Sequence, residues 1–592
     1  MKKIIKHKLS LTLLSVISSF FTFSISVAYA STQLATEQPS DPTKIFASDL
    51  AHYSKRDIKD EVFYFVLPDR FNNGDTTNDN GSKTKTISQG GFDPSNKMAF
   101  HGGDLQGLTS RLPYLENLGI TAIWLTPILR NQAVQGDITG YHGYWVLDFT
   151  EIDPHLGTNA DLKSFINHAH EKNIKVFFDI ITNHTADVVK YKECHGEDGS
   201  GWSESGEACP YISLAEIAKG KTYSTIVPKE NQHLKTPAWL NDPKHYHNQG
   251  DSTFEGENSL NGDFFGLDDL NTESPEVVNG MIDIYQNIIS EFKPDGFRID
   301  TVKHVNIEFW QQFIPALESH AKQQGIENFF MFGEVYSGDP KELSNFTTKG
   351  KLPSVLDFGL QSALYQTLIE NKGTDKLAEL FAQDVLYKNA NELLNFTGNH
   401  DMGRFAYLLN SKGEQFNQKQ TSDRLALATA ITFFARGVPV IYYGDEQGFV
   451  GDGGNHDSRQ DMMPSKVASY NNDTLLLSTK NTAENNFDQH HPLYQLFSSF
   501  AQLFHQHPTL RYGKQKTLYS SEKTGLFALS RTFENEQYIV VFNTAAQAKP
   551  VNIALDADYH LIHASHQAPQ LLPAKETSHN LEKLSFAIYR KR

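Results

Sequence analysis

Short apolar runs alternate with amphipathic helical stretches along most of this chain. The apolar runs predict strands over residues 62–67, 120–125, 174–181, 296–300, 329–332, 354–358, 392–396 and 438–443. The stretches between them predict helices, the clearest over 108–118, 161–172, 275–292, 307–324 and 423–435. Strands that alternate with helices indicate a parallel sheet, and eight such units predict a (β/α)₈ TIM barrel.

Two regions depart from this rhythm. Residues 186–265 are rich in Gly, Pro, His and Asn and predict an irregular insertion after the third strand. From about residue 510 the pattern becomes short alternating segments at 525–529, 538–542 and 551–555, which predicts a small all-β sandwich. We therefore divide the chain into the barrel in two parts (31–184 and 267–509), an inserted domain (185–266) and a C-terminal β domain (510–592).

The first 30 residues have the composition of an export signal. Four lysines precede a long apolar region, and Ala28-Tyr29-Ala30 forms a small-x-small cleavage site. An uncleaved membrane anchor is the alternative, because the apolar region is long. Export to the periplasm or the medium also favours pairing of the two cysteines, Cys194 and Cys209, over two free thiols.

Composition limits the ligands that this chain would bind. The 592 residues carry a net charge of −17, which argues against nucleic acid, because nucleic-acid binding needs basic patches. Aromatic residues make up 12% of the chain. An aromatic surplus on an acidic chain suits neutral sugars, whose apolar faces stack on aromatic rings, and bound cations.

Polar side chains gather where the predicted strands end. The candidates are Asn183, His184, Asp300, Glu334, His400 and Asp401. In parallel barrels the catalytic groups come from the C-terminal strand ends, so these residues should share one face. Arg298 lies two residues before Asp300 on the same strand face, and a nearby cation favours an ionised carboxylate. By itself this stretch equally suits a structural Arg–Asp pair.

Several motifs in order along the chain resemble those of the α-amylase family, glycoside hydrolase family 13. They lie at 179–184, 266–271, 296–304, 333–335, 396–401 and 437–446. The resemblance implies Asp300 as nucleophile, Glu334 as general acid/base and Asp401 as transition-state stabiliser. Glu334 has no basic neighbour in sequence and follows an apolar strand, so we expect its pKa to be raised.

The resemblance also implies a substrate site for an α-glucan. The residues that it assigns to the sugar are His142, Tyr144, His184, Arg298, Lys303, His304 and His400. Lys303-His304 resembles α-1,4-specific members, so we expect an endo-acting hydrolase of starch, glycogen and maltooligosaccharides. Phe265 and Tyr336 instead resemble the acceptor-binding aromatics of cyclodextrin glucanotransferases.

Three alternatives therefore remain beside the hydrolase. A cyclodextrin glucanotransferase would carry two more domains after the single β domain, and we expect this difference to disfavour it. A cyclomaltodextrinase or maltogenic-type enzyme would carry a long N-terminal domain. An inactive glucan-binding homologue would lack the carboxylates that this chain retains. We expect a monomer that binds neither nucleic acid nor, after signal cleavage, a membrane.

The resemblance implies one or two structural calcium ions. Asn183, Asp269 and the backbone carbonyl of His304 match the family site between barrel and inserted domain. A second site resembles the loop whose candidate ligands are Asn73, Asp75, Asn78, Asp79, Gly102 and Asp104. Oxygen-bearing side chains around a glycine turn suit Ca²⁺, although an ordinary Asn/Gly loop has the same composition.

Overall fold

The computed structural model describes residues 47–82, 86–196, 209–411, 416–574 and 580–592. The predicted signal segment, residues 1–30, lies outside this part of the chain. Within it, no helix combines the length and apolar character needed to cross a membrane.

Eight parallel strands form the central sheet, in the order β12-β11-β10-β7-β2-β1-β14-β13. A parallel bridge between Leu356 and Leu394 joins its two edges and closes the barrel. The strands are β1 (Phe63–Val66), β2 (Ala122–Leu125), β7 (Lys175–Ile180), β10 (Gly296–Ile299), β11 (Phe330–Gly333), β12 (Ser354–Val355), β13 (Leu394–Asn395) and β14 (Val438–Tyr442). The predicted TIM barrel is confirmed, with the sixth and seventh strands shorter than expected.

The barrel strands are buried on both faces, which explains their continuous apolar character. Phe63 packs inside the barrel with its ring centroid 4.7 Å from that of Phe177 and 5.7 Å from that of Phe332. These rings fill the interior below the strand ends. The barrel is therefore a packed core, and chemistry is confined to its C-terminal face.

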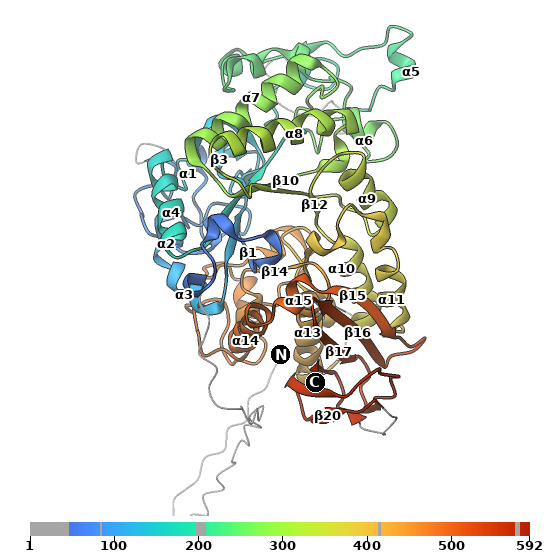
Figure 1. The fold of residues 1–592 in the computed structure, drawn as a ribbon. Helices are drawn as coiled ribbons and strands as arrows, with labels where there is room; N and C mark the ends of the chain where they lie inside the picture. Colours follow the sequence, from blue (N-terminus) through green and yellow to red (C-terminus); the bar gives the residue numbers. More distant parts are fainter. Residues whose placement is uncertain (1–46, 83–85, 197–208, 412–415, 575–579) are drawn as a thin grey trace, which may run out of the picture.

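Helices surround the barrel (Figure 1). They include α2 (Leu105–Ser110), α3 (Leu112–Leu118), α4 (Asn159–Glu171), α7 (Pro275–Phe292), α8 (Ile307–Gln323), α9 (Pro340–Thr348), α10 (Phe358–Leu364), α11 (Asp375–Phe381), α12 (Phe405–Asn410), α13 (Gln418–Phe434), α14 (Pro492–Gln506) and α15 (Pro508–Tyr512). The helix predicted over 108–118 is two helices that meet at Arg111. Pro113 is the physical reason, because proline cannot donate the hydrogen bond that would continue the first helix.

Irregular segments cover the C-terminal face of the barrel. Between β2 and α4 lie β3 (Leu129–Asn131), β4 (Val134–Gln135), β5 (Ile138–Thr139) and β6 (Val146–Ile152). The segment 185–266 holds β8 (Lys190–Tyr191), α5 (Leu214–Ile217), β9 (Thr225–Ile226) and α6 (Asn258–Asn261). In the described residues of these segments the regular elements are short.

The C-terminal region is an antiparallel sheet in the order β15-β16-β17-β22-β19-β20, with a separate β18-β21 pair. In Figure 1 it lies at the opposite end of the molecule from α5. Its strands are β15 (Lys514–Tyr519), β16 (Leu526–Phe533), β17 (Glu536–Asn543), β18 (Lys549–Pro550), β19 (Tyr559–Ala564), β20 (Leu571–Leu572), β21 (Asn580–Leu581) and β22 (Ser585–Lys591). Phe527, Phe542 and Phe586 belong to the barrel core, so this sheet packs directly on the barrel.

The strand predicted at 551–555 is wrong. Val551 and Ile553 are buried in the second core of the C-terminal sheet, so the alternation of apolar and polar side chains is real. The main chain there has no strand partner, because β18 pairs with β21 only at Lys549–Pro550. Burial of alternate side chains therefore occurs here without a ladder of hydrogen bonds.

Candidate active site

Asp300 and Glu334 follow directly after two neighbouring strands. Asp300 succeeds β10 and Glu334 succeeds β11, and these strands pair in register up to Ile299 and Gly333. The Glu334 amide donates to the Ile299 carbonyl at 2.8 Å, which fixes the two residues side by side. Both residues therefore lie at the same height along the barrel axis, at its C-terminal end.

One guanidinium, that of Arg298, holds both carboxyl groups. Its Nη1 lies 2.6 Å from Asp300 Oδ1, and its Nη2 lies 3.0 Å from Glu334 Oε2. The Thr301 amide also donates to Glu334 Oε2 at 3.2 Å. Glu334 has no basic neighbour in sequence, but Arg298 reaches it in space from the adjacent strand.

A third carboxyl group, that of Asp179 on β7, shares the same cation. Arg298 Nη1 lies 2.7 Å from Asp179 Oδ1. Burial, opposed by Arg298, raises the pKa of Asp179 to about 7. Burial also raises the pKa of Asp300, and the neighbouring Glu334 and Asp179 carboxylates add to this effect against Arg298. Arg298 therefore does not hold Asp300 ionised as simply as its sequence spacing predicts.

Three carboxyl groups around one cation cannot all ionise at low cost, because like charges in a buried site repel. Burial and the neighbouring carboxylates therefore raise the pKa values of Asp179 and Asp300, which favours protonation within the cluster. A general acid needs such a proton, and a neighbouring nucleophile needs the remaining charge. A cluster of carboxyl groups around one guanidinium can hold both a proton and a negative charge.

Asp401 faces the same space from the loop after β13. Its side chain is 38% exposed, against 8% for Asp300 and 7% for Glu334. Arg459 Nη2 lies 3.2 Å from Asp401 Oδ1 and orients this carboxylate. Arg459 comes from the irregular segment after β14, where no sequence pattern indicated its role.

A cavity of about 660 Å³ opens above the carboxyl groups of Asp300, Glu334 and Asp401. Among the predicted site residues it is lined by His142, Tyr144, His184, Phe265, Asp300, Lys303, His304, Glu334, Tyr336 and Asp401. Sequence reasoning missed the lining residues Ile138, Trp145, Phe254, Phe264, Leu267, Thr301, Asn455, His456 and Arg459. Of the predicted residues, Arg298 and His400 lie behind this lining and support it.

We call His142, Tyr144, His184 and Arg459 the polar wall of the cavity. The hydroxyl of Tyr144 lies 2.8 Å from His400 Nε2 and donates to Asp179 Oδ2 at 3.2 Å. Burial lowers the pKa of His184 to about 3 and also lowers the pKa values of His142 and His400. These imidazoles are therefore neutral and can donate hydrogen bonds without adding charge.

One ring nitrogen of the polar wall, His184 Nε2, is buried without a hydrogen-bond partner among the described residues. Leaving a buried polar atom unpaired costs about 1–3 kcal/mol, so such atoms mark places where a ligand supplies the partner. Since His184 lines the cavity, this nitrogen is placed to receive a ligand's polar group.

Phe254, Phe264, Phe265 and Tyr336 form what we call the aromatic wall. Phe265 is 76% exposed and Tyr336 48% exposed, and both line the cavity. The Phe254 ring lies 4.8 Å from Phe265 and 5.2 Å from Phe264, centroid to centroid. Exposed rings in a cleft suit stacking against the apolar face of a sugar.

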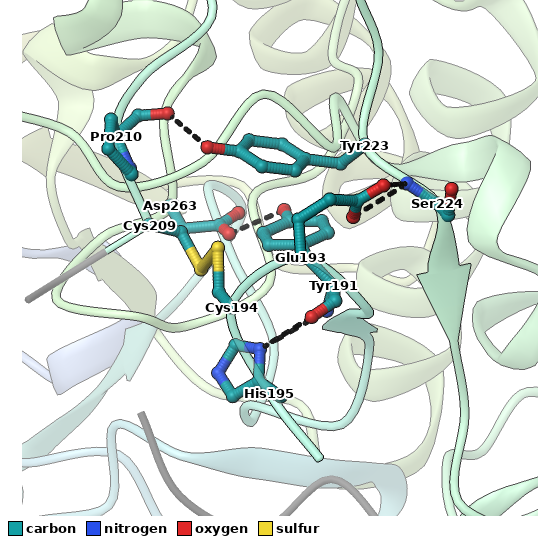
Figure 2. Close-up of a disulfide and its surroundings, with 9 residues drawn as sticks. All are labelled: Tyr191, Glu193, Cys194, His195, Cys209, Pro210, Tyr223, Ser224 and Asp263. Carbon is teal, nitrogen blue, oxygen red and sulfur yellow. Dashed lines mark hydrogen bonds between the residues drawn. A yellow bond between two sulfur atoms is a disulfide. The ribbon is translucent and has the colours of Figure 1, made fainter. Parts of the chain in front are cut away.

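Cys194 and Cys209 form a disulfide with a Cα–Cα distance of 5.7 Å. Figure 2 shows it beside Tyr191, whose hydroxyl donates to Asp263 Oδ2 at 2.6 Å. The Asp251 amide donates to the Cys209 carbonyl at 2.8 Å. The disulfide therefore anchors the segment that ends in Phe264 and Phe265.

The two sets of residues predicted to bind calcium differ in their surroundings. No group of three or more acidic, His or Cys side chains able to hold a metal occurs in the described part of the chain, so either set must rely on amide or main-chain oxygens. At the first set, the Leu270 amide donates to the Asn183 carbonyl at 2.9 Å, which brings Asn183 beside Asp269. His247 Nδ1 already lies 2.6 Å from Asp269 Oδ2.

The second set fits a hard cation better. The amide oxygens Asn73 Oδ1 and Asn78 Oδ1 are buried without a hydrogen-bond partner among the described residues. Burial raises the pKa values of Asp79 and Asp104, and their mutual repulsion raises that of Asp79 further. A Cβ on Gly102 would lie 2.8 Å from Asp79 Oδ1, so glycine alone leaves this space open. Unpaired amide oxygens beside two buried carboxyl groups match Ca²⁺ chemistry.

A closed parallel barrel with paired carboxyl groups at its C-terminal face is the architecture of a barrel glycoside hydrolase. A model of the alpha-amylase catalytic domain matches residues 65–513. An alpha-amylase of Streptomyces lividans is 43% identical over 539 residues, covering 86% of this chain and 58% of that protein. The chain belongs to the α-amylase family.

Solved structures give the same fold. An Anoxybacillus alpha-amylase matches with a TM-score of 0.67 and 28% identity over 91% of this chain and 99% of its own. A cyclomaltodextrin glucanotransferase with a three-domain ABC distribution matches with a TM-score of 0.67 and 26% identity over 90% of this chain and 99% of its own. The expectation that domain number separates hydrolases from these transferases is therefore wrong.

Proposed function

We propose that this chain is an endo-acting α-amylase that hydrolyses α-1,4-glucosidic bonds in starch, glycogen and maltooligosaccharides with retention of configuration. One observation carries the proposal. Asp300 and Glu334 sit at the ends of adjacent strands, share the guanidinium of Arg298 and open with Asp401 into one cavity. The similarity to the Streptomyces alpha-amylase supports the same activity.

In the first step, an Asp300 oxygen forms a bond to C1 of the sugar while Glu334 protonates the departing glycosidic oxygen. A retaining mechanism needs the two carboxyl groups roughly 5–5.5 Å apart. The Asp401 carboxylate would stabilise the positive charge that develops on the sugar ring. In the second step, Glu334 takes a proton from water, and the hydroxide oxygen displaces Asp300 from C1.

A product time course on soluble starch and maltoheptaose tests this function. Chromatography with anomeric detection should show a ladder of linear maltooligosaccharides released as α-anomers. β-Anomers would contradict the retaining mechanism. An absence of products, with calcium present, would favour an inactive glucan-binding protein.

The aromatic wall supports a second candidate, an α-glucan transferase. Phe265 and Tyr336 expose their rings in the cavity, where they would bind an acceptor sugar that competes with water for the glycosyl group. The three-domain cyclomaltodextrin glucanotransferase has a similar fold. In the same time course, cyclic products or oligomers longer than the maltoheptaose supplied would identify a transferase.

We further propose a structural Ca²⁺ at the loop of Asn73, Asn78, Asp79 and Asp104, with a second one at Asn183, Asp269 and the His304 carbonyl. The unpaired amide oxygens support the first of these most directly. Calcium bound only by the folded chain raises the melting temperature. Treatment with EDTA should therefore lower it, and added Ca²⁺ should restore it. The Asn73→Ala variant should lose most of the response, whereas an unchanged melting temperature in EDTA would contradict both sites.

We also propose that residues 1–30 direct export and are removed. The basic start, the apolar region and the Ala28-Tyr29-Ala30 motif support this reading. Mass spectrometry of the mature protein should give an N-terminus at Ser31. A mature chain that still begins at Met1 would favour the uncleaved anchor. Gel filtration of the mature protein should show a monomer.

A further inference from the structure

His456 lies on the cavity beside the polar wall and takes no part in the mechanism above. It lines the cavity and is half-buried. Its Nδ1 lies 2.7 Å from the hydroxyl of Tyr141. Its Nε2 has no hydrogen-bond partner among the described residues, so one ring nitrogen is held by the protein and the other is left for a ligand.

The partners of Tyr141 decide which nitrogen of His456 carries the proton. Arg459 Nη1 donates to the Tyr141 hydroxyl at 3.2 Å. A guanidinium can only donate, so the tyrosine oxygen is the acceptor of that bond and its own hydrogen is available for His456 Nδ1. Nδ1 then accepts, and the proton of the neutral ring resides on Nε2.

The surroundings hold this arrangement in place. The guanidinium of Arg70 lies 3.9 Å from the centroid of the Tyr141 ring, which fixes the ring by a cation–π contact. Burial, with Arg459, Arg70 and Lys97, lowers the pKa of His456 to about 4. The imidazole is therefore neutral at ordinary pH, and its Nε2–H is a donor without charge.

We propose that His456 is a substrate-binding residue that donates a hydrogen bond from Nε2 to a hydroxyl group of the α-glucan chain, with Tyr141 and Arg459 acting as positioning residues for its tautomer. This inference rests on the proposed function. Arg459 also binds Asp401, so the contact lies on the side of the cavity where that carboxylate is oriented. A bond of this kind fixes the register in which a glucan lies across Asp300 and Glu334.

The test compares His456→Ala, His456→Gln and Tyr141→Phe with the parent on maltoheptaose labelled at its reducing end. One neutral hydrogen bond is lost in His456→Ala, which should raise KM about 2- to 13-fold and shift the cleaved bond, with little change in kcat. Gln carries a donor near the position of Nε2 and should restore both values. Tyr141→Phe should shift KM in the same direction by less.

The matched control is His560→Ala, which removes an exposed imidazole on β19 and should change nothing. Parent KM and parent cleavage pattern in His456→Ala would overturn the inference. So would a raised KM that Gln does not reverse, because that result would reflect lost packing.

Calorimetry on variants that also carry Glu334→Gln measures the affinity for maltoheptaose without turnover. Weaker binding in His456→Ala there supports the inference, and equal binding overturns it. If the parent releases no product from α-1,4-glucans, the proposed function fails whatever the binding data show. The two failures are therefore distinguishable.

Discussion

The polar wall and the aromatic wall of the cavity are built in opposite ways. His184 follows β7 at the barrel rim and is buried and hydrogen-bonded on one side, whereas Phe265 lies on the inserted segment and is 76% exposed. The two walls meet where the His184 ring lies parallel to Phe264, with centroids 5.2 Å apart. His184 therefore belongs to the barrel rim, and Phe265 belongs to the segment inserted into the barrel.

This difference indicates a division of labour. Groups fixed by strand ends can be placed accurately against a reacting sugar, and preorganised donors stabilise charge without rearrangement. Exposed rings on a loop offer stacking area that tolerates several positions of a sugar. We therefore expect the polar wall to govern rate and the aromatic wall to govern the fate of the glycosyl group, water or a second sugar.

The largest effect should come from the polar wall. His184→Ala removes the imidazole whose Nε2 is unpaired beside the cavity, and we expect kcat/KM on soluble starch to fall about 10²-fold, as for loss of one preorganised donor. Initial rates at several substrate concentrations measure this. His233→Ala, an exposed imidazole of the inserted segment, is the control. A fall of less than about 3-fold, under 1 kcal/mol, would place His184 outside the reaction.

An intermediate effect should come from the aromatic wall. Phe265→Gly removes the exposed ring at a residue with φ of +53°, which glycine adopts readily, so the fold should persist. We expect the ratio of transfer to hydrolysis products from maltoheptaose to fall several-fold, with the hydrolysis rate nearly unchanged. Phe265→Tyr keeps a ring and should keep the parent ratio. Equal ratios in the glycine variant and the parent would remove the acceptor role.

The smallest effect on catalysis should come from the disulfide of the inserted segment. The bond closes a loop with a sequence separation of 15 residues, and the chain-entropy model assigns such a loop about 3 kcal/mol. The double variant Cys194→Ser/Cys209→Ser should lower the melting temperature while changing kcat on starch little. Starch kinetics and thermal melts of the variant and the parent check both. A large loss of kcat would show that the insertion also orders the catalytic carboxyl groups.

The barrel can be predicted from the sequence because the spacing of apolar residues along the chain matches the burial of the strands. The strands are largely apolar and buried on both faces, and several are followed by a chemistry-bearing residue, as at Asp300 after β10 and Glu334 after β11. Barrel topology then brings these residues together without knowledge of any loop. The prediction of a single helix over 108–118 overlooked Pro113, which interrupts the helix there.

The remaining site residues lie in irregular segments, where apolar and polar residues follow no regular spacing. Arg459 and His456 come from the irregular segment after β14, and Phe254 from the insertion at a φ of +63°. Their positions depend on long-range contacts, such as the bond from Arg459 to Asp401, which spans 58 residues. The influence of Arg298 on Glu334 was missed for the same reason, because the two lie on different strands.

Trapping the glycosyl-enzyme tests the central claim most directly. In Glu334→Gln, α-maltosyl fluoride can still react, because fluoride leaves without a general acid, while hydrolysis of the intermediate is slow without a general base. Intact-mass measurement followed by peptide mapping should find one maltosyl group on the peptide that contains Asp300. A maltosyl group on the peptide of Asp401, or on no peptide while fluoride is still released, would contradict a retaining mechanism through Asp300.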